Sequence, residues 1–112
     1  MNFGDVVTVD LGVPIGSEAG FLRPGIVMTA DAFLRFRPTS VFVVPLTTTR
    51  RPFPSHVEVE ADQRSGLPQP SWAQVEQLRA VAVERCSTPT GNVGPASTHQ
   101  ILEILAMITG MP

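Results

Sequence analysis

A threonine-rich segment followed by two arginines is the clearest candidate for chemistry in the sequence. After the apolar run 41–46 come three hydroxyl and two guanidinium side chains: Thr47, Thr48, Thr49, Arg50 and Arg51. Hydroxyls donate hydrogen bonds to phosphate oxygens, and guanidinium groups bind phosphate through paired N–H donors. Threonine is also common in exposed strands, and arginine is common at protein surfaces. From these residues alone, a phosphate-binding edge and an ordinary surface are equally good interpretations.

Arg23 is the second candidate, because it stands just before the apolar run 25–29. A charged side chain that leaves a rigid element can be held in a fixed position. Ser17 and Glu18 precede it in the long connection 12–24. The alternative interpretation is structural, with Arg23 paired to Glu18 or closing the end of a strand.

A carboxylate and a guanidinium lie three residues apart in the segment Glu76-Gln77-Leu78-Arg79. In a strand, the two side chains would point to opposite faces. The carboxylate could act as a general base and the arginine as a clamp for negative charge. The alternative is a structural ion pair for each, and from these residues alone the structural use is the favoured interpretation.

Four single residues carry weaker signals. Trp72 is the only tryptophan and could stack on a base, or form part of a core or interface. His56 alternates with valines and is expected to point outward as a bystander. Cys86 has no activating partner in the sequence, and with His56 and His99 it gives no zinc-like spacing. We therefore expect no metal and no other cofactor.

The composition restricts the classes of function. The chain has 112 residues, enough for one domain spanning 1–112. All eight basic residues are arginine, which excludes Gly-Lys phosphate loops, Schiff-base lysines and Ser-Lys dyads. The net charge of -2 argues against a nonspecific nucleic-acid coat, so any nucleic-acid contact must involve a few arginines. A single cysteine, no signal-like N-terminus and no membrane-length apolar run indicate a cytoplasmic protein.

Five segments have strand character, and one C-terminal segment has helical spacing. The predicted strands are 5–11, 25–29, 41–46, 55–61 and 72–84, and a short helical turn is expected over 31–36. After Gly94-Pro95, apolar residues recur at helical spacing to Ile108, which predicts a terminal amphipathic helix of about three turns. Short strands with one terminal helix predict a mainly β fold, with a strongly bent antiparallel sheet closing toward a barrel.

Taken in order, these motifs resemble the MazF/PemK family of toxins from type II toxin–antitoxin modules. The matching segments are Gly4-Asp5-Val6-Val7-Thr8-Val9-Asp10-Leu11, Gly16-Ser17-Glu18, Arg23-Pro24-Gly25-Ile26-Val27, Val44-Pro45-Leu46-Thr47-Thr48 and Glu76-Gln77-Leu78-Arg79. The resemblance extends from residue 4 to the terminal helix, near residue 108.

The resemblance implies a small SH3-like barrel of the CcdB/PemK type that forms a homodimer. It implies metal-free, sequence-specific cleavage of single-stranded RNA (mRNA, rRNA or tRNA), with the 2′-hydroxyl as nucleophile and 2′,3′-cyclic phosphate and 5′-hydroxyl ends. Arg23 and Thr47 match the family's catalytic residues. Glu18 and Glu76 match acidic positions of the family, and either of them is a candidate for the general base. The implied RNA contacts are Ser17, Thr48, Thr49, Arg50, Arg51, Gln77 and Arg79. A cognate antitoxin is also implied, with a disordered acidic segment over the Arg23/Thr47 groove.

Two other functions stay open at this stage. A sister toxin group of the same fold poisons DNA gyrase through residues near its C-terminus, whereas this chain runs into Met111-Pro112 with no obvious motif for that activity. A non-catalytic barrel could instead bind other proteins through Phe21, Leu22 and Trp72.

Overall fold

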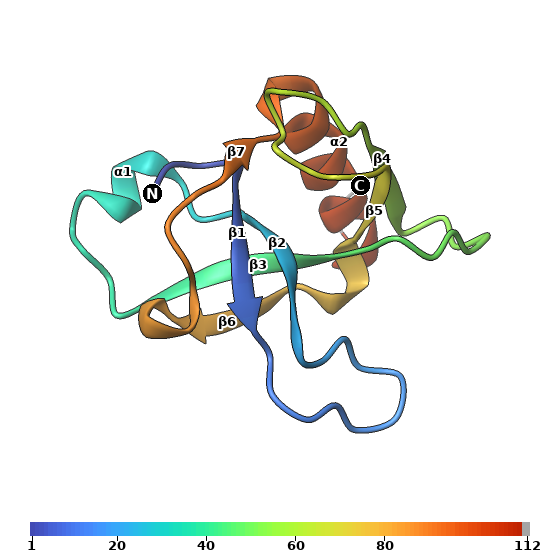
Figure 1. The fold of residues 1–112 in the computed structure, drawn as a ribbon, viewed down its shortest axis with the longest axis horizontal. Helices are drawn as coiled ribbons and strands as arrows, with labels where there is room; N and C mark the ends of the chain where they lie inside the picture. Colours follow the sequence, from blue (N-terminus) through green and yellow to red (C-terminus); the bar gives the residue numbers. More distant parts are fainter. Residues whose placement is uncertain (111–112) are drawn as a thin grey trace.

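A computed structural model describes residues 1–110, which form seven strands, two helices and two 3₁₀ turns (Figure 1). The strands are β1 (Asp5–Asp10), β2 (Leu22–Val27), β3 (Ser40–Thr47), β4 (His56–Val59), β5 (Ser71–Gln74), β6 (Arg79–Ala82) and β7 (Gly91–Asn92). The helices are α1 (Asp31–Leu34) and α2 (Gly94–Ile108), and the 3₁₀ turns are η1 (Val75–Gln77) and η2 (Val83–Arg85). Met111 and Pro112, where the gyrase-poisoning alternative was considered, lie outside the described residues.

The sheet is antiparallel and curls around its longest strand, β3. The strand order is β4-β5-β3-β2-β1-β7, and β6 also pairs with β3. β6 pairs with the first half of β3, from Ser40 to Val43, whereas β5 pairs with its end, at Leu46 and Thr47. The two ends of β3 therefore belong to two parts of the sheet, and the sheet bends between them. The result is a bent, half-closed barrel, which confirms the predicted mainly β fold with one terminal helix.

β3 is apolar from Val41 to Leu46 because over most of this length its two faces are buried in separate cores, with Phe42 the one exposed residue of the run. Val44 and Leu46 pack in one core, together with Ile101 of helix α2. Val41 and Val43 pack in a second core on the other side. A strand covered on both faces has no wet side and therefore shows a continuous apolar run instead of an alternation.

The predicted strand 72–84 is wrong as a single element. Its period-two pattern continues through residues that form β5, η1, β6 and η2 in turn. β5 and β6 pair with opposite ends of β3, so the chain has to change direction between them, and it does so at η1. This break moves Glu76 and Gln77 out of a strand and into a tight turn.

Two smaller differences also bear on the site. The second strand begins at Leu22, because Leu22 and Arg23 already pair with Asp10 and Val9 of β1. Arg23 therefore lies inside a strand, not before one. β7 has only two residues, too few for a period to be read from sequence. Among residues 1–110, no helix combines the length and the apolar character needed to cross a membrane.

Candidate functional site

The two main candidates from the sequence, Arg23 and the threonine segment, lie together at one open pocket. Arg23 comes from β2, and Thr47 comes from the end of the neighbouring strand β3. The pocket has a volume of about 300 Å³ and is lined by Arg23, Pro24, Leu46, Thr47, Thr48, Thr49 and Ser71. Residues more than twenty positions apart in the sequence thus form one polar surface, as a phosphate-binding edge requires.

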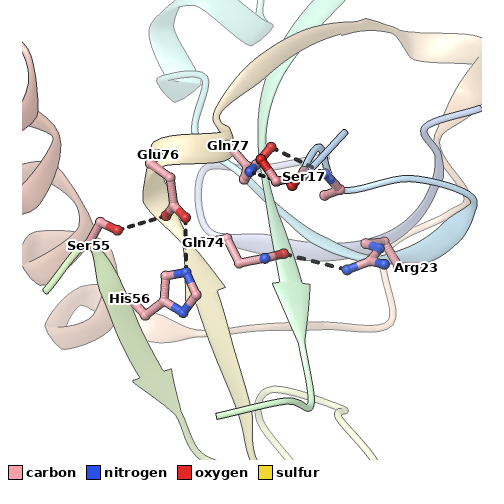
Figure 2. Close-up of polar contacts among 8 residues, drawn as sticks. Ser17, Arg23, Ser55, His56, Gln74, Glu76 and Gln77 are labelled. Carbon is pink, nitrogen blue, oxygen red and sulfur yellow. Dashed lines mark hydrogen bonds and ion pairs between the residues drawn. The ribbon is translucent and has the colours of Figure 1, made fainter. Parts of the chain in front are cut away.

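Arg23 is held by neutral oxygen atoms only. Its Nε donates a hydrogen bond to the carbonyl oxygen of Gly20 at 3.0 Å. Its Nη1 lies 3.4 Å from the Leu46 carbonyl oxygen and 3.5 Å from Oε1 of Gln74 (Figure 2). Within residues 1–110, no carboxylate lies within ion-pair distance of Arg23, so the suggested pairing with Glu18 is wrong. The guanidinium is fixed in place, and its charge is available to an anion.

The threonine segment turns away from the sheet directly at the pocket. Thr47 is the last residue of β3, and its Oγ1 accepts a hydrogen bond from the backbone N–H of Thr49 at 3.2 Å. Accepting this bond leaves the hydroxyl proton of Thr47 available as a donor. Arg50 and Arg51 follow and are exposed, but they line a neighbouring pocket and not the one that contains Arg23.

Glu76 lies in η1 and forms a hydrogen-bonded pair with His56 of β4. His56 Nε2 is 3.0 Å from one carboxylate oxygen, and the Ser55 hydroxyl donates to the other at 2.9 Å (Figure 2). Partial burial acts to raise the pKa of Glu76, but the hydrogen bonds from His56, its own backbone and Ser55 lower the pKa by more. The net shift is below the ordinary value, so Glu76 is ionised at neutral pH.

His56 was expected to point outward, and this prediction is wrong. Its side chain is 1% exposed, whereas Glu58, on the same face of β4, is exposed. The reason is that η1 packs beside the start of β4, and the Phe53 ring packs edge-on against the imidazole with 5.1 Å between centroids. Alternation describes the middle of the strand correctly, but it cannot show what covers its first residue.

Gln77 and Arg79 hold the long connection between β1 and β2. Gln77 Nε2 donates to the Ser17 carbonyl oxygen at 3.2 Å, and its Oε1 accepts from the Ala19 backbone N–H at 3.2 Å (Figure 2). Arg79 Nη1 lies 3.4 Å from the Leu11 carbonyl oxygen. Both side chains, expected from the sequence as RNA contacts, thus anchor this loop.

Ser17 and Glu18 are exposed on this anchored loop. The Glu18 carboxylate accepts a hydrogen bond from the Ile15 backbone N–H at 2.9 Å, which stabilises the turn between them. The Gly20 carbonyl oxygen accepts a hydrogen bond from Arg23, and β2 begins two residues after Gly20, at Leu22. The loop that carries Glu18 is therefore tied to η1 at one point and to Arg23 at another.

Trp72 and Cys86 complete the residues singled out in the sequence. Trp72 lies in β5 and is half-buried, paired with Thr47 on one side and Glu58 on the other. Burial raises the pKa of the Cys86 thiol, which disfavours the reactive thiolate. The sequence analysis did not name Gln74, which contacts Arg23, and it placed His56 outside the site, because its partner Glu76 is 20 positions away in the sequence.

The chain matches the family model of the PemK-like, MazF-like toxins of type II toxin–antitoxin systems over residues 2–109. It belongs to this family. A MazF9 endoribonuclease from Mycobacterium tuberculosis is 34% identical, with 96% of this chain and 94% of the relative covered. The endoribonuclease EndoA from Bacillus subtilis is 35% identical, with 73% of this chain and 71% of the relative covered. Relatives of this MazF/PemK chain are thus named as endoribonucleases.

Solved structures of MazF proteins have the same fold. MazF from Deinococcus radiodurans superposes with a TM-score of 0.84 at 18% identity, with 99% of this chain and 97% of that chain covered. An endoribonuclease from a mycobacterial species, solved in complex with its cognate antitoxin, superposes with a TM-score of 0.77 at 24% identity. That match covers 100% of this chain and 97% of the other. These similarities confirm the MazF-like fold.

Proposed function

We propose that this MazF/PemK protein is the toxin of a type II toxin–antitoxin system and cleaves single-stranded RNA without a metal ion. The observation that carries the proposal is Arg23, a fixed guanidinium with no carboxylate partner among residues 1–110, at the rim of a pocket of threonines. A phosphodiester matches this site in charge and in hydrogen bonding. The endoribonuclease names of its relatives support the same activity.

In the proposed reaction, the 2′-hydroxyl of the RNA attacks the adjacent phosphorus, and the bond from phosphorus to the 5′-oxygen breaks. The products carry a 2′,3′-cyclic phosphate and a 5′-hydroxyl. Because the nucleophile belongs to the substrate, the protein has to orient the phosphate, accept the 2′-hydroxyl proton and stabilise negative charge. The leaving 5′-oxygen takes its proton from water at the open pocket, which gives the 5′-hydroxyl end. Arg23 and the hydroxyl of Thr47 supply the charge stabilisation, and Arg23 remains a cation throughout.

Glu18 is the better of the two carboxylates for the role of general base. Both oxygens of Glu76 already accept hydrogen bonds, and the lowered pKa makes that carboxylate a weaker base. Glu18 is exposed, and its loop is held in place by Gln77 and by the contact from Gly20 to Arg23. We therefore assign Glu76 to holding His56 and Glu18 to the proton transfer.

The proposed active form is a homodimer in the cytoplasm. Helix α1, the segment after it and β3 carry three exposed phenylalanines: Phe33 at 67%, Phe36 at 83% and Phe42 at 52%. Phe33 and Phe42 also line an apolar pocket of about 320 Å³. Large exposed apolar patches mark protein interaction sites. A second copy of the chain would cover this patch. The Arg23 pocket shares no lining residue with the apolar pocket and would stay accessible to RNA.

The proposed antitoxin neutralises the site by charge. A disordered acidic segment of a second protein would place carboxylates where the RNA phosphates bind, at Arg23 and Thr47. Its binding would compete with RNA. Failure of a bound antitoxin to inhibit cleavage would rule out this mode of neutralisation.

Incubation with single-stranded RNA in EDTA separates the proposed function from its two alternatives. Cleavage to fragments with 2′,3′-cyclic phosphate ends supports the nuclease. Intact RNA together with inhibition of DNA gyrase supports a gyrase-poisoning toxin of the same fold. Intact RNA and active gyrase support a non-catalytic protein-binding barrel.

A further inference from the structure

A second pocket adjoins the phosphate pocket and has no role in the proposed cleavage. It has a volume of about 520 Å³ and is lined by Arg50, Arg51, Pro52, Phe53, His56, Glu58 and Trp72. Trp72 connects the two pockets, since its backbone pairs with Thr47 of β3 on one side and with Glu58 of β4 on the other. A chain molecule bound at Arg23 can therefore extend into this second pocket.

His56 brings an unused hydrogen-bonding atom to this pocket. Among buried side-chain nitrogen and oxygen atoms of residues 1–110, its Nδ1 is the one without a hydrogen-bond partner. Buried polar atoms without partners are rare in folded proteins, because each costs the free energy of desolvation. An atom of this kind beside a pocket indicates that its partner arrives with a ligand.

In the neutral form of the imidazole, Nδ1 needs a donor as its partner. The ionised carboxylate of Glu76 can only accept, so in that form the ring proton lies on Nε2 and a lone pair lies on Nδ1. Glu58 at the same pocket is a carboxylate and also an acceptor. His56 and Glu58 thus both line a space that is also bordered by Trp72 and Phe53.

We propose that this pocket binds the nucleobase next to the scissile phosphate and that His56 selects a base with an exocyclic amino group. The inference rests on the proposed function and deepens it. Aromatic faces stack on bases of any sequence, and Arg50 and Arg51 supply charge for the flanking phosphate. Cytosine, adenine and guanine present an exocyclic amino donor to Nδ1. Uracil has no amino group, and its one ring donor on the pairing edge, N3–H, lies between two carbonyl oxygens that repel the acceptors.

Phe53 controls access to Nδ1, which has no exposed surface in the free protein. The Phe53 ring packs against the imidazole, yet it is 48% exposed and belongs to segment 48–55, which has no helix or strand. Loop residues of this kind rearrange more easily than residues in the sheet. A base that enters the pocket takes the place of Phe53 against the His56 ring.

The fluorescence of Trp72, the only tryptophan, measures binding in this pocket without any cleavage. The probes are octamers of 2′-O-methylcytidine and of 2′-O-methyluridine, which lack the nucleophilic hydroxyl. Their bases differ only at C4, amino against carbonyl, and in the proton on N3. We expect the cytidine octamer to bind at least about 10-fold more tightly, as one matched base contact provides. Equal affinities for the wild-type protein would overturn the proposal, whatever the variants do.

Two substitutions then test His56 itself. His56→Gln keeps a donor near Glu76 but has no acceptor at the Nδ1 position, so its preference for cytidine should fall to about 2-fold or less. His56→Asn places an amide near Nδ1 and loses the bond to Glu76, so part of the preference should remain. Full preference in His56→Gln would overturn the role of His56. A cytidine preference without RNA cleavage in EDTA would contradict the nuclease and keep the base pocket, so the two failures are distinguishable.

Discussion

Glu76 and His56 form a hydrogen-bonded pair that connects η1 to the first residue of β4, with 3.0 Å between the carboxylate oxygen and Nε2. The histidine side chain is 1% exposed and the glutamate side chain 31%. The pair therefore stabilises a junction of the sheet and determines which imidazole nitrogen faces the second pocket. A residue that the sequence offered as a catalytic base is better explained as the partner that orients a histidine.

The pair predicts a pH-dependent contribution to stability. The folded-state pKa of Glu76 lies below its ordinary value of 4.5, so its stabilising effect is complete above that value and is lost as the pH falls through the lowered pKa. The free energy of unfolding should therefore be higher for wild type than for Glu76→Gln at pH 6.5, and the difference should shrink toward pH 3. Urea denaturation at the two pH values measures it. A difference that is constant with pH would contradict the ionised pair.

The anchoring of the long loop by Gln77 predicts a local effect of its removal. Gln77→Ala loses both hydrogen bonds to the loop, so the backbone N–H of Ala19 should exchange with solvent faster. RNA cleavage should also fall, because the loop positions Glu18. Gln100→Ala, at an exposed position of α2, is the control and should change neither. Unaltered exchange at Ala19 in Gln77→Ala would show that the loop is held by other contacts.

The burial of Ile101 predicts how strongly α2 is fixed to the sheet. Ile101 is 0% exposed in the core shared with β3, whereas its neighbour Leu102 is 45% exposed. Ile101→Ala should lower the free energy of unfolding by about 2–5 kcal/mol. Leu102→Ala should lower it by less than about 1 kcal/mol. Urea denaturation of the two variants checks this, and equal losses would mean that α2 packs on a different face.

The exposed phenylalanines predict the location of the dimer interface. Phe42→Asp places a charge in the proposed interface and should convert a dimer at micromolar concentration into a monomer, as measured by analytical ultracentrifugation. Phe21→Asp is a matched control, since Phe21 is 62% exposed but lies in the loop before β2. A wild-type protein that is monomeric, or a Phe42→Asp protein that stays dimeric, would contradict the assignment.

Local patterns in the sequence predict those elements whose type can be read from their own residues. The predicted strand 5–11 contains β1, the apolar run 41–46 lies inside β3, and the terminal helix begins at Gly94-Pro95. The proximity of Arg23 and Thr47 follows from the pairing of β2 with β3, and the family resemblance anticipated it. These features depend on local periodicity and on neighbouring strands.

The features that the sequence analysis missed depend on residues far apart. Segment 72–84 breaks into four elements because β3 offers its two ends to different partners, which no period within the segment records. His56 is buried by η1, whose position depends on that same break. Gln77 holds the loop through its amide, a contact with residues about 60 positions away that its residue type does not show.

The most direct test of the central claim compares RNA cleavage by Arg23→Ala with that by Arg64→Ala in the presence of EDTA. Arg64 is an exposed arginine between β4 and β5, outside both pockets and outside the phenylalanine patch, and controls for the loss of one positive charge. If Arg23 stabilises the charge on the scissile phosphate, Arg23→Ala should lower the cleavage rate by about 100-fold or more. Arg64→Ala should cleave at close to the wild-type rate. Equal cleavage by wild type and Arg23→Ala would contradict the assignment of this pocket as the catalytic site.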